Sequence, residues 1–229
     1  MTNYDVFNGD ADGICALQQL RLQYPKEAEL ITGLKRDISL LKKVHAQLDD
    51  EVTVLDISLD KNRDELVKLL GAGAKIFYAD HHFPGELPEH ENLELYIDPS
   101  ADTCTSLIVN NVLDGSQARW AVVGAFGDNF DAAAIALGES IGLNRKELAD
   151  YQQLGICLNY NGYGFELEDL AFHPAELFRL VNPYQNPQDF IKNEPGYQAL
   201  LTQYHSDMAL SQSAVAESQT DTTAMYLLP

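Results

Sequence analysis

Acidic residues and histidines recur in four short motifs of the chain, and these residue types commonly bind divalent metal ions. The motifs are "NGDADG", "VLDISLD", "ADHHFPG" and "GAFGDNFD", and they supply Asp10, Asp12, Asp56, Asp80, His81, His82 and Asp128. Carboxylate oxygens suit hard cations, and Mn²⁺ also accepts imidazole nitrogen. Two metal ions a few ångströms apart need a bridging carboxylate and several terminal ones. The inventory therefore suits a hydrolytic site with two metal ions.

The elements that must position these motifs alternate between strands and helices in the first half of the chain. Apolar and β-branched runs predict strands at residues 4–7, 29–33, 51–57, 74–80 and 93–98. Helical spacing of apolar residues predicts helices at 12–24, 36–48 and 61–73. This alternation predicts an α/β fold, a parallel sheet with helices on both faces. Ligands bind beyond the carboxyl ends of such strands, where the chain places Asp10, Asp12, Asp56, Asp80 and Asp98.

The second half of the sequence has a different pattern. From about residue 102 the apolar periodicity is helical, and after about residue 183 the chain becomes polar and rich in proline. We expect a catalytic domain over 1–183 and a helical linker over 184–220. The segment 221–229 resembles the start of a strand, so we expect it to begin a C-terminal substrate-binding domain that is otherwise absent.

The four motifs, in this order, resemble those of the DHH phosphoesterase family, which is named for an Asp-His-His triplet. The resemblance covers about residues 4–180. It implies two Mn²⁺ ions, with Mg²⁺ or Co²⁺ as substitutes. Within that resemblance Asp10 would bind the first ion and Asp12 the second, Asp56 would bridge both, and His81 and Asp128 would complete the second site. His82 would face the substrate phosphate, and Asp80 would hold the geometry of the triplet.

One position departs from the family pattern. Many family members carry a histidine two residues before the first aspartate, as a ligand of the first metal ion, and here that position is Asn8. Asparagine is a weaker oxygen donor, so the first ion would bind more loosely or keep an additional water. Because some nuclease-like members also lack the histidine, we interpret the change as a mark of a subfamily.

Each motif also has a simpler structural interpretation. "NGDADG" could be a turn that caps a helix, Asp56 could end a strand, and the two histidines could belong to a surface loop. Lys35 and Arg36 follow the second predicted strand and could touch a phosphate, although a solvated helix start explains them more simply. The other candidate substrate contacts are Thr105 and Ser106, for which helix capping is the alternative, and His173, for which a structural histidine with its hydrogen bonds satisfied is the alternative.

Composition limits the class of substrate. The chain has 229 residues and a formal net charge of −20, which disfavours tight binding of long DNA or RNA. We found no signal peptide and no membrane-spanning run. The three cysteines are far apart, which favours reduced thiols in a cytoplasmic protein. We expect no membrane partner, and a homodimer is compatible with the sequence.

The function expected from these features is Mn²⁺-dependent hydrolysis of short linear oligonucleotides to mononucleotides, as in the nuclease-like (nanoRNase) branch of the family. Linear di-guanylate (pGpG) from nucleotide signalling is the candidate dinucleotide. Two alternatives stay open at this point. The chain could be a phosphatase acting on 3′-phosphoadenosine phosphate or pyrophosphate, or a regulatory module that binds nucleotide or metal without catalysis.

Overall fold

The computed structural model describes residues 1–226 and places a parallel sheet at the centre of the chain. The strand order is β2-β1-β3-β4-β5, and every neighbouring pair is parallel. The strands are β1 (Asn3–Phe7), β2 (Glu29–Ile31), β3 (Glu51–Leu55), β4 (Lys75–Asp80) and β5 (Leu93–Ile97). Each of the five predicted strands is therefore present, and the predicted α/β class is confirmed.

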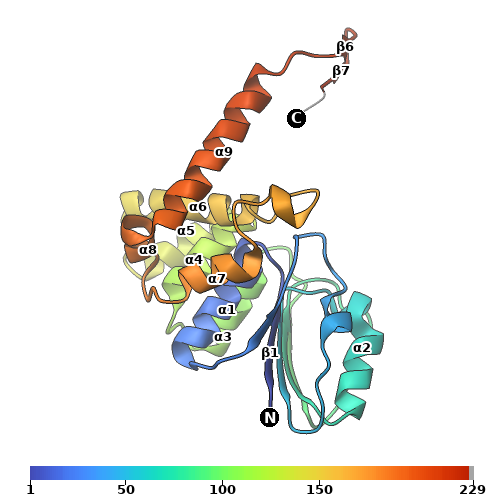
Figure 1. Cartoon of the computed structure of the whole chain (residues 1–229). Coiled ribbons are helices and arrows are strands. Elements are labelled where there is room, and N and C mark those ends of the chain that lie inside the picture. Colours follow the sequence, from blue (N-terminus) through green and yellow to red (C-terminus); the bar gives the residue numbers. More distant parts are fainter. Residues whose placement is uncertain (227–229) are drawn as a thin grey trace.

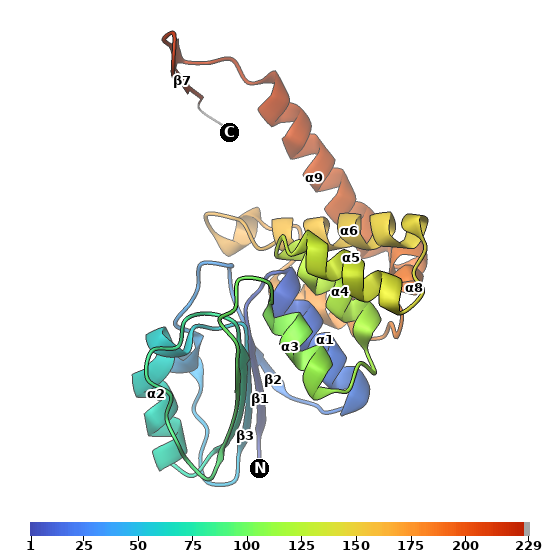
Figure 2. The same cartoon turned by 180° about the vertical axis from the view of Figure 1, so that it is seen from behind.

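Helices cover both faces of the sheet, as predicted (Figure 1). The helix α2 (Leu59–Gly71) lies on one face, together with the segment around the short 3₁₀ helix η1 (Leu40–Lys43). On the opposite face α1 (Ala11–Gln23) and α3 (Thr105–Val112) pack against the sheet, as Figure 2 shows from behind. The other helices on this side are α4 (Ala118–Gly127), α5 (Asp131–Ser140), α6 (Arg145–Tyr160) and α7 (Pro174–Val181). Each face has its own hydrophobic core.

The helix α1 is the centre of the larger core. Its residues from Ala11 to Arg21 are all buried, because the sheet, α3, α4, α6 and α7 surround it. A helix that is buried on every side needs polar groups with internal partners. Gln19 donates to the carbonyl of Ser106 at 3.1 Å, and Arg21 pairs with Asp5 of β1. These contacts fix the helix whose start carries Asp10 and Asp12.

The last part of the chain is helical, with α8 (Pro187–Asn193) and α9 (Pro195–Ser213). Phe190, Tyr197 and Leu200 are buried in the core of the helical half. The rest of α9 projects from the body and leads to a small antiparallel pair, β6 (Ser218–Gln219) and β7 (Ala224–Met225) (Figure 1). The expected strand at 221–229 corresponds in part to β7, and its last three residues lie outside the described part.

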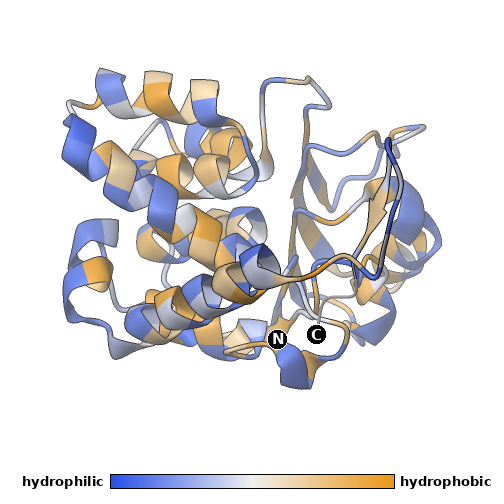
Figure 3. Cartoon of the chain, turned by 90° about the horizontal axis from the view of Figure 1, so that it is seen from above, coloured by the Kyte–Doolittle hydropathy of each residue, from blue (hydrophilic) through white to orange (hydrophobic). Residues whose placement is uncertain are grey.

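Hydrophobic segments of the ribbon concentrate in the helices of the larger half and in the strands, whereas many loops are hydrophilic (Figure 3). Within residues 1–226, no helix is both long enough and apolar enough to cross a membrane.

The order of the strands gives the sheet a topological switch point. From β1 the chain passes to β2 on one side and then returns to β3 on the other, so the loops after β1 and β3 diverge and leave a crevice at the carboxyl edge.

One predicted helix is wrong. Residues 36–48 form loops around the short η1, although their apolar side chains are buried as the periodicity suggested. The reason is a competing side chain from α2. Asn62 accepts from the amide of Leu41 at 3.3 Å and donates to the carbonyl of Ile38 at 2.6 Å. These hydrogen bonds stabilise a non-helical backbone.

Candidate metal centre

The predicted ligands converge at the carboxyl edge of the sheet, at its switch point. One pocket there is lined by side chains from the loops after β1, β2, β3 and β4, from the first turn of α2 and from the end of α4, namely Asn8, Asp10, Lys35, Ile38, Asp56, Ser58, Lys61, His81, His82 and Asp128. This edge faces upward in Figure 1, beneath the loop that follows α6. Residues far apart in the sequence therefore share one site.

Asp10 both caps a helix and faces the cluster. It is the N-cap of α1, and its Oδ1 accepts from the amide of Gly13 at 3.0 Å. Gly13 allows the helix to start close to the strand, since a Cβ there would collide with the carbonyl oxygen of Asn8. The other carboxylate oxygen of Asp10, Oδ2, lies 2.6 Å from Nζ of Lys35. The turn and the functional interpretation of "NGDADG" are therefore compatible.

Asp12 is completely buried and is held by the first turn of α3. Its two carboxylate oxygens accept from the amides of Thr105 and Ser106, each at 2.7 Å, and Ser106 Oγ donates to the Asp12 carbonyl at 2.9 Å. Burial raises the pKa of Asp12, and the charge of Asp128 adds to the effect. Thr105 and Ser106 were expected to contact a substrate anion, but in the structure the anion they bind is Asp12.

Asp56 sits at a strained backbone position directly after β3. Its φ is 58°, in the left-handed region that aspartate tolerates better than most residues. The carboxylate accepts from Thr105 Oγ1 at 3.2 Å and lies 3.5 Å from His81 Nε2. Burial raises the pKa of Asp56 well above its usual range, and the charges of Asp10 and Asp12 raise it further. This concentration of buried carboxylates calls for a cation.

The Asp-His-His triplet divides its two imidazoles between two environments. His82 Nδ1 lies 2.7 Å from Asp80 Oδ1, and this hydrogen bond raises the pKa of His82 against the effect of partial burial. His81 instead points its Nε2 to the acids, at 3.5 Å from Asp56 and 3.4 Å from Asp128. Asp80 is completely buried and is therefore the positioning partner of His82.

Two groups of side chains have the donors that a divalent cation requires. Asp12, His81 and Asp128 form one group, and Asp56, His81 and His82 form the other, with ligand atoms within 4.8 Å of one another in each group. Mixed carboxylate and imidazole donors fit Mn²⁺. In addition, Asp80 Oδ2 and Asn8 Oδ1 are buried without a hydrogen-bond partner. The residues present therefore fit at least one such ion.

Lys35 belongs to the acidic cluster, although the sequence indicated it only as a candidate phosphate contact or a solvated helix start. Its ammonium lies 2.6 Å from Asp10 Oδ2, 3.1 Å from Asp128 Oδ1 and 3.0 Å from Asn159 Oδ1. Burial lowers the pKa of Lys35, but the carboxylates of Asp10 and Asp128 outweigh this and raise it above its usual value. The interpretation as a solvated helix start is wrong for this residue. Its position after a strand end was the available signal.

Other candidates lie outside the cluster. Arg36 donates to the carbonyl of Phe165, and its guanidinium carbon lies 5.0 Å from the centroid of the Phe165 ring. His173 is the N-cap of α7 and accepts from the amide of Ala175 at 3.2 Å. Asp98, at the end of the edge strand β5, is exposed and accepts from Ser100. The strand-end position alone therefore did not bring Asp98 into the site.

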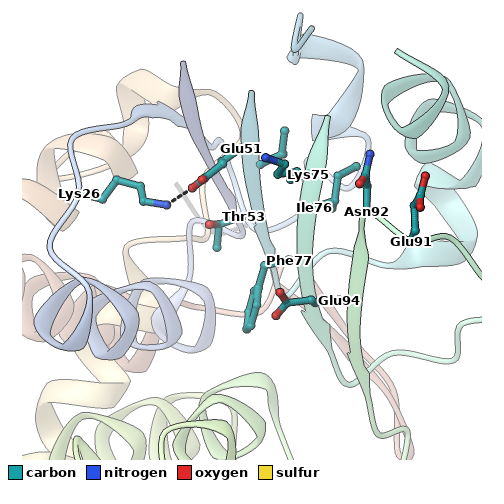
Figure 4. A pocket seen from close by; sticks show the side chains of 10 residues that line it. Lys26, Glu51, Thr53, Lys75, Ile76, Phe77, Glu91, Asn92 and Glu94 are labelled. Carbon is teal, nitrogen blue, oxygen red and sulfur yellow. Dashed lines mark hydrogen bonds and ion pairs between the residues drawn. The ribbon is translucent and has the colours of Figure 1, made fainter. Parts of the chain in front are cut away.

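A second hollow lies at the opposite edge of the sheet, where the strands begin (Figure 4). Its charged side chains have mixed signs, and Lys26 forms an ion pair with Glu51 across it. Among the described residues, no buried polar atom without a partner belongs to the side chains that line it. We therefore assign the candidate site to the carboxyl edge.

Comparisons with known proteins agree with this fold. No protein-family model matches the sequence, and no curated protein matches it either. The structure resembles a DHH domain from a member of a family of ribosomal proteins, with a TM-score of 0.59 and 11% identity over 98% of this chain and 62% of that one. It also resembles the exonuclease RecJ bound to manganese, with a TM-score of 0.50 and 17% identity over 93% of this chain and 63% of that one.

The chain thus spans less than two thirds of either neighbour. At these identities the likeness concerns the fold alone, an α/β arrangement around a parallel sheet that resembles the DHH domain of the first of these structures.

Proposed function

We propose that the chain is a metal-dependent phosphodiesterase, with Mn²⁺ as its preferred ion, that hydrolyses short linear oligonucleotides. The observation that carries this proposal is the convergence of Asp12, Asp56, His81 and Asp128 beside an Asp80–His82 pair at the switch point of the sheet. A likeness of fold to DHH-domain proteins supports it.

The residues have separable tasks in this chemistry. A divalent cation held by Asp12, Asp56, His81 and Asp128 would supply a Lewis acid for a phosphoryl oxygen and would acidify water. His82 has its Nδ1 fixed by Asp80, so Nε2 is the ring nitrogen left for a substrate. Because its pKa is raised, His82 is suited to donate to a phosphoryl oxygen as charge develops there.

A second pocket beside the acids suggests where a nucleobase would lie. It is lined by Lys35, Arg36, Gly162, Tyr163 and Gly164, and it adjoins the metal site through Lys35. The ring of Tyr163 is largely exposed, as is the neighbouring Phe165. Exposed aromatic rings stack bases without strong sequence preference. This arrangement supports a substrate of a few nucleotides, for which linear di-guanylate is our candidate.

A second candidate function is a regulatory module that binds a nucleotide without cleaving it. The specific observation in its favour is Lys35, because its ammonium already neutralises part of the acidic charge that metal ions would offset.

The test measures hydrolysis directly. The purified chain would be incubated with Mn²⁺ and, separately, with a linear dinucleotide, 3′-phosphoadenosine phosphate or pyrophosphate, and the products separated by chromatography. We expect mononucleotides from the dinucleotide and no product with the Asp56→Asn variant or with EDTA. Consumption of one of the other two substrates alone would replace the phosphodiesterase by a phosphatase. Binding of the dinucleotide without any product would favour the regulatory module.

A further inference from the structure

The position of Lys35 within the acidic cluster has a direct bearing on how many metal ions the site can hold. Its Nζ contacts Asp10 at the start of α1, Asp128 at the end of α4 and Asn159 in α6. An ammonium has three N–H donors, and here three oxygen acceptors lie within hydrogen-bond distance. No donor is left for a substrate, so Lys35 acts as a fixed internal charge.

The backbone around Lys35 is also held in place. Its amide donates to the carbonyl of Gly162 at 3.0 Å, and its carbonyl accepts from Asn8 Nδ2 at 3.3 Å. The side chain is mostly buried, with 24% of it exposed. Asn8, which stands where a metal-binding histidine would be expected, therefore turns its amide group toward Lys35, while its Oδ1 has no partner.

A lysine ammonium and a divalent cation compete for the same oxygens. Asp10 directs one carboxylate oxygen to the helix cap and the other, Oδ2, to Lys35, so a metal ion bound at Oδ2 would have to displace the ammonium. A second cation at this point would also lie within a few ångströms of the ammonium, where like charges repel strongly in a partly buried site. By contrast, Asp128 bonds Lys35 through Oδ1 and directs Oδ2 to His81.

We propose that the ammonium of Lys35 takes the place of the first metal ion, so that this chain binds a single divalent cation, at Asp12, Asp56, His81 and Asp128. Asp128, in place of Asp56, then links the two positive charges of the site. The proposal rests on the proposed function in that it takes these four side chains as metal ligands. It changes the expectation of a two-ion centre into that of a mixed centre with one ion and one ammonium.

The test counts bound Mn²⁺ per chain by equilibrium dialysis and elemental analysis, in wild type, in Lys35→Met and in Lys61→Met. Lys61 lines the same pocket, but its side chain is 59% exposed and lies 3.5 Å from Asp60, so it is the matched control. We expect one ion in wild type and in Lys61→Met, and two in Lys35→Met. Electron paramagnetic resonance should show exchange-coupled manganese only in Lys35→Met.

Equal Mn²⁺ counts in wild type and folded Lys35→Met would overturn the proposal. Two exchange-coupled ions in wild type would also overturn the proposal. This result needs no variant, so the proposal can be tested even if the Lys35→Met protein does not fold. The count is independent of turnover. If the counts are as expected but no dinucleotide is cleaved, the proposed function fails and the role of Lys35 stands. If the dinucleotide is cleaved but wild type binds two ions, the proposed function stands and the role given to Lys35 fails.

Discussion

Asp10 and Asp12 are separated by one residue but have different surroundings. Asp10 caps α1 and pairs with Lys35, whereas Asp12 is clamped by two amides of α3. The Asp12 carboxylate is therefore fixed in orientation before any ligand binds. Such preorganisation removes the cost of ordering a ligand side chain when a cation arrives.

His82 and Asp56 should differ in what they contribute. Asp56→Asn should abolish Mn²⁺ binding and hydrolysis together, because it removes a charge from the centre of the cluster. His82→Ala should keep the Mn²⁺ count and lower kcat by about 10²- to 10³-fold, the usual effect of losing a donor to developing charge. Metal analysis and steady-state rates on both variants provide the measurement. Loss of Mn²⁺ from His82→Ala would show that His82 is a ligand, as its grouping with Asp56 and His81 also allows.

At the scale of elements, small residues let the helices around α1 approach closely. A Cβ on Gly155 of α6 would lie 2.5 Å from the carbonyl oxygen of Val123 and 2.8 Å from the amide nitrogen of Gly127, both in α4. The end of α4 carries Asp128, so this crossing helps to position an acid of the site. Backbone atoms cannot yield as a flexible side chain can, and extra volume here must displace a helix.

Gly155→Ala should therefore destabilise the protein by about 1–3 kcal/mol, the usual cost of overpacking a core. For a chain of this length that corresponds to a fall in Tm of roughly 2–4 °C per kcal/mol. The matched control is Gly71→Ala at the exposed end of α2, where a Cβ meets nothing within 4 Å. Gly71→Ala should stabilise the protein by about 0.4–1 kcal/mol. If the Gly155→Ala and Gly71→Ala variants had the same Tm, this account of the α4–α6 contact would be wrong.

The elements that the sequence predicted correctly are those with uninterrupted hydrophobic patterns. The strands β1 and β3 are apolar runs bounded by turns, so the local pattern was sufficient to predict them. The 36–48 segment has apolar side chains at helical spacing, yet Asn62 from a distant helix fixes its backbone in loops. A side chain that is remote in sequence leaves no local signal, and this is why that prediction failed.

The sequence also predicted part of the candidate site, namely the residues that follow recognisable elements. Three of the four motifs could be placed at strand ends from the sequence and the motif of Asp128 in the helical half, and the structure brings Asp10, Asp12, Asp56 and Asp128 together with the triplet. The partners of Lys35 were not predictable, because they depend on the α4 and α6 helices folding back over the loop after β2. Its partners Asp128 and Asn159 lie 93 and 124 residues away along the chain.

At the scale of the whole molecule, the three cysteines report on the integrity of the core. Cys15, Cys104 and Cys157 are free and buried, and burial raises the pKa of each thiol. The thiolate is the reactive form, so at about pH 8 a native sample should not react with Ellman's reagent. The same sample in guanidinium should release three equivalents. Rapid reaction of one thiol in the native protein would show that the segment around that cysteine opens locally.

The net charge of −20 sets how the molecule responds to salt when it meets an anionic substrate. Proteins that bind nucleic acid through basic surfaces lose affinity as salt rises, because counterions are no longer released favourably. Here the surface repels the phosphates, except near Lys35, Arg36 and Lys61 at the pocket. Salt therefore screens a repulsion, and the affinity for an anionic substrate should rise with salt, whereas that of a basic nucleic-acid-binding surface falls.

We expect KM to fall as NaCl rises from about 20 mM to about 200 mM, because the screening length shortens to roughly 10 Å or less over that range. The fall should be larger for a long single strand than for a dinucleotide, since a long strand places more phosphates against the acidic surface. The measurement is the initial rate against substrate concentration at each salt, with Mn²⁺ held saturating and the ratio of the two KM values compared. A KM that rises steeply with salt for the long strand would mean that a basic path for nucleic acid exists on this surface, and the restriction to short substrates would then be wrong.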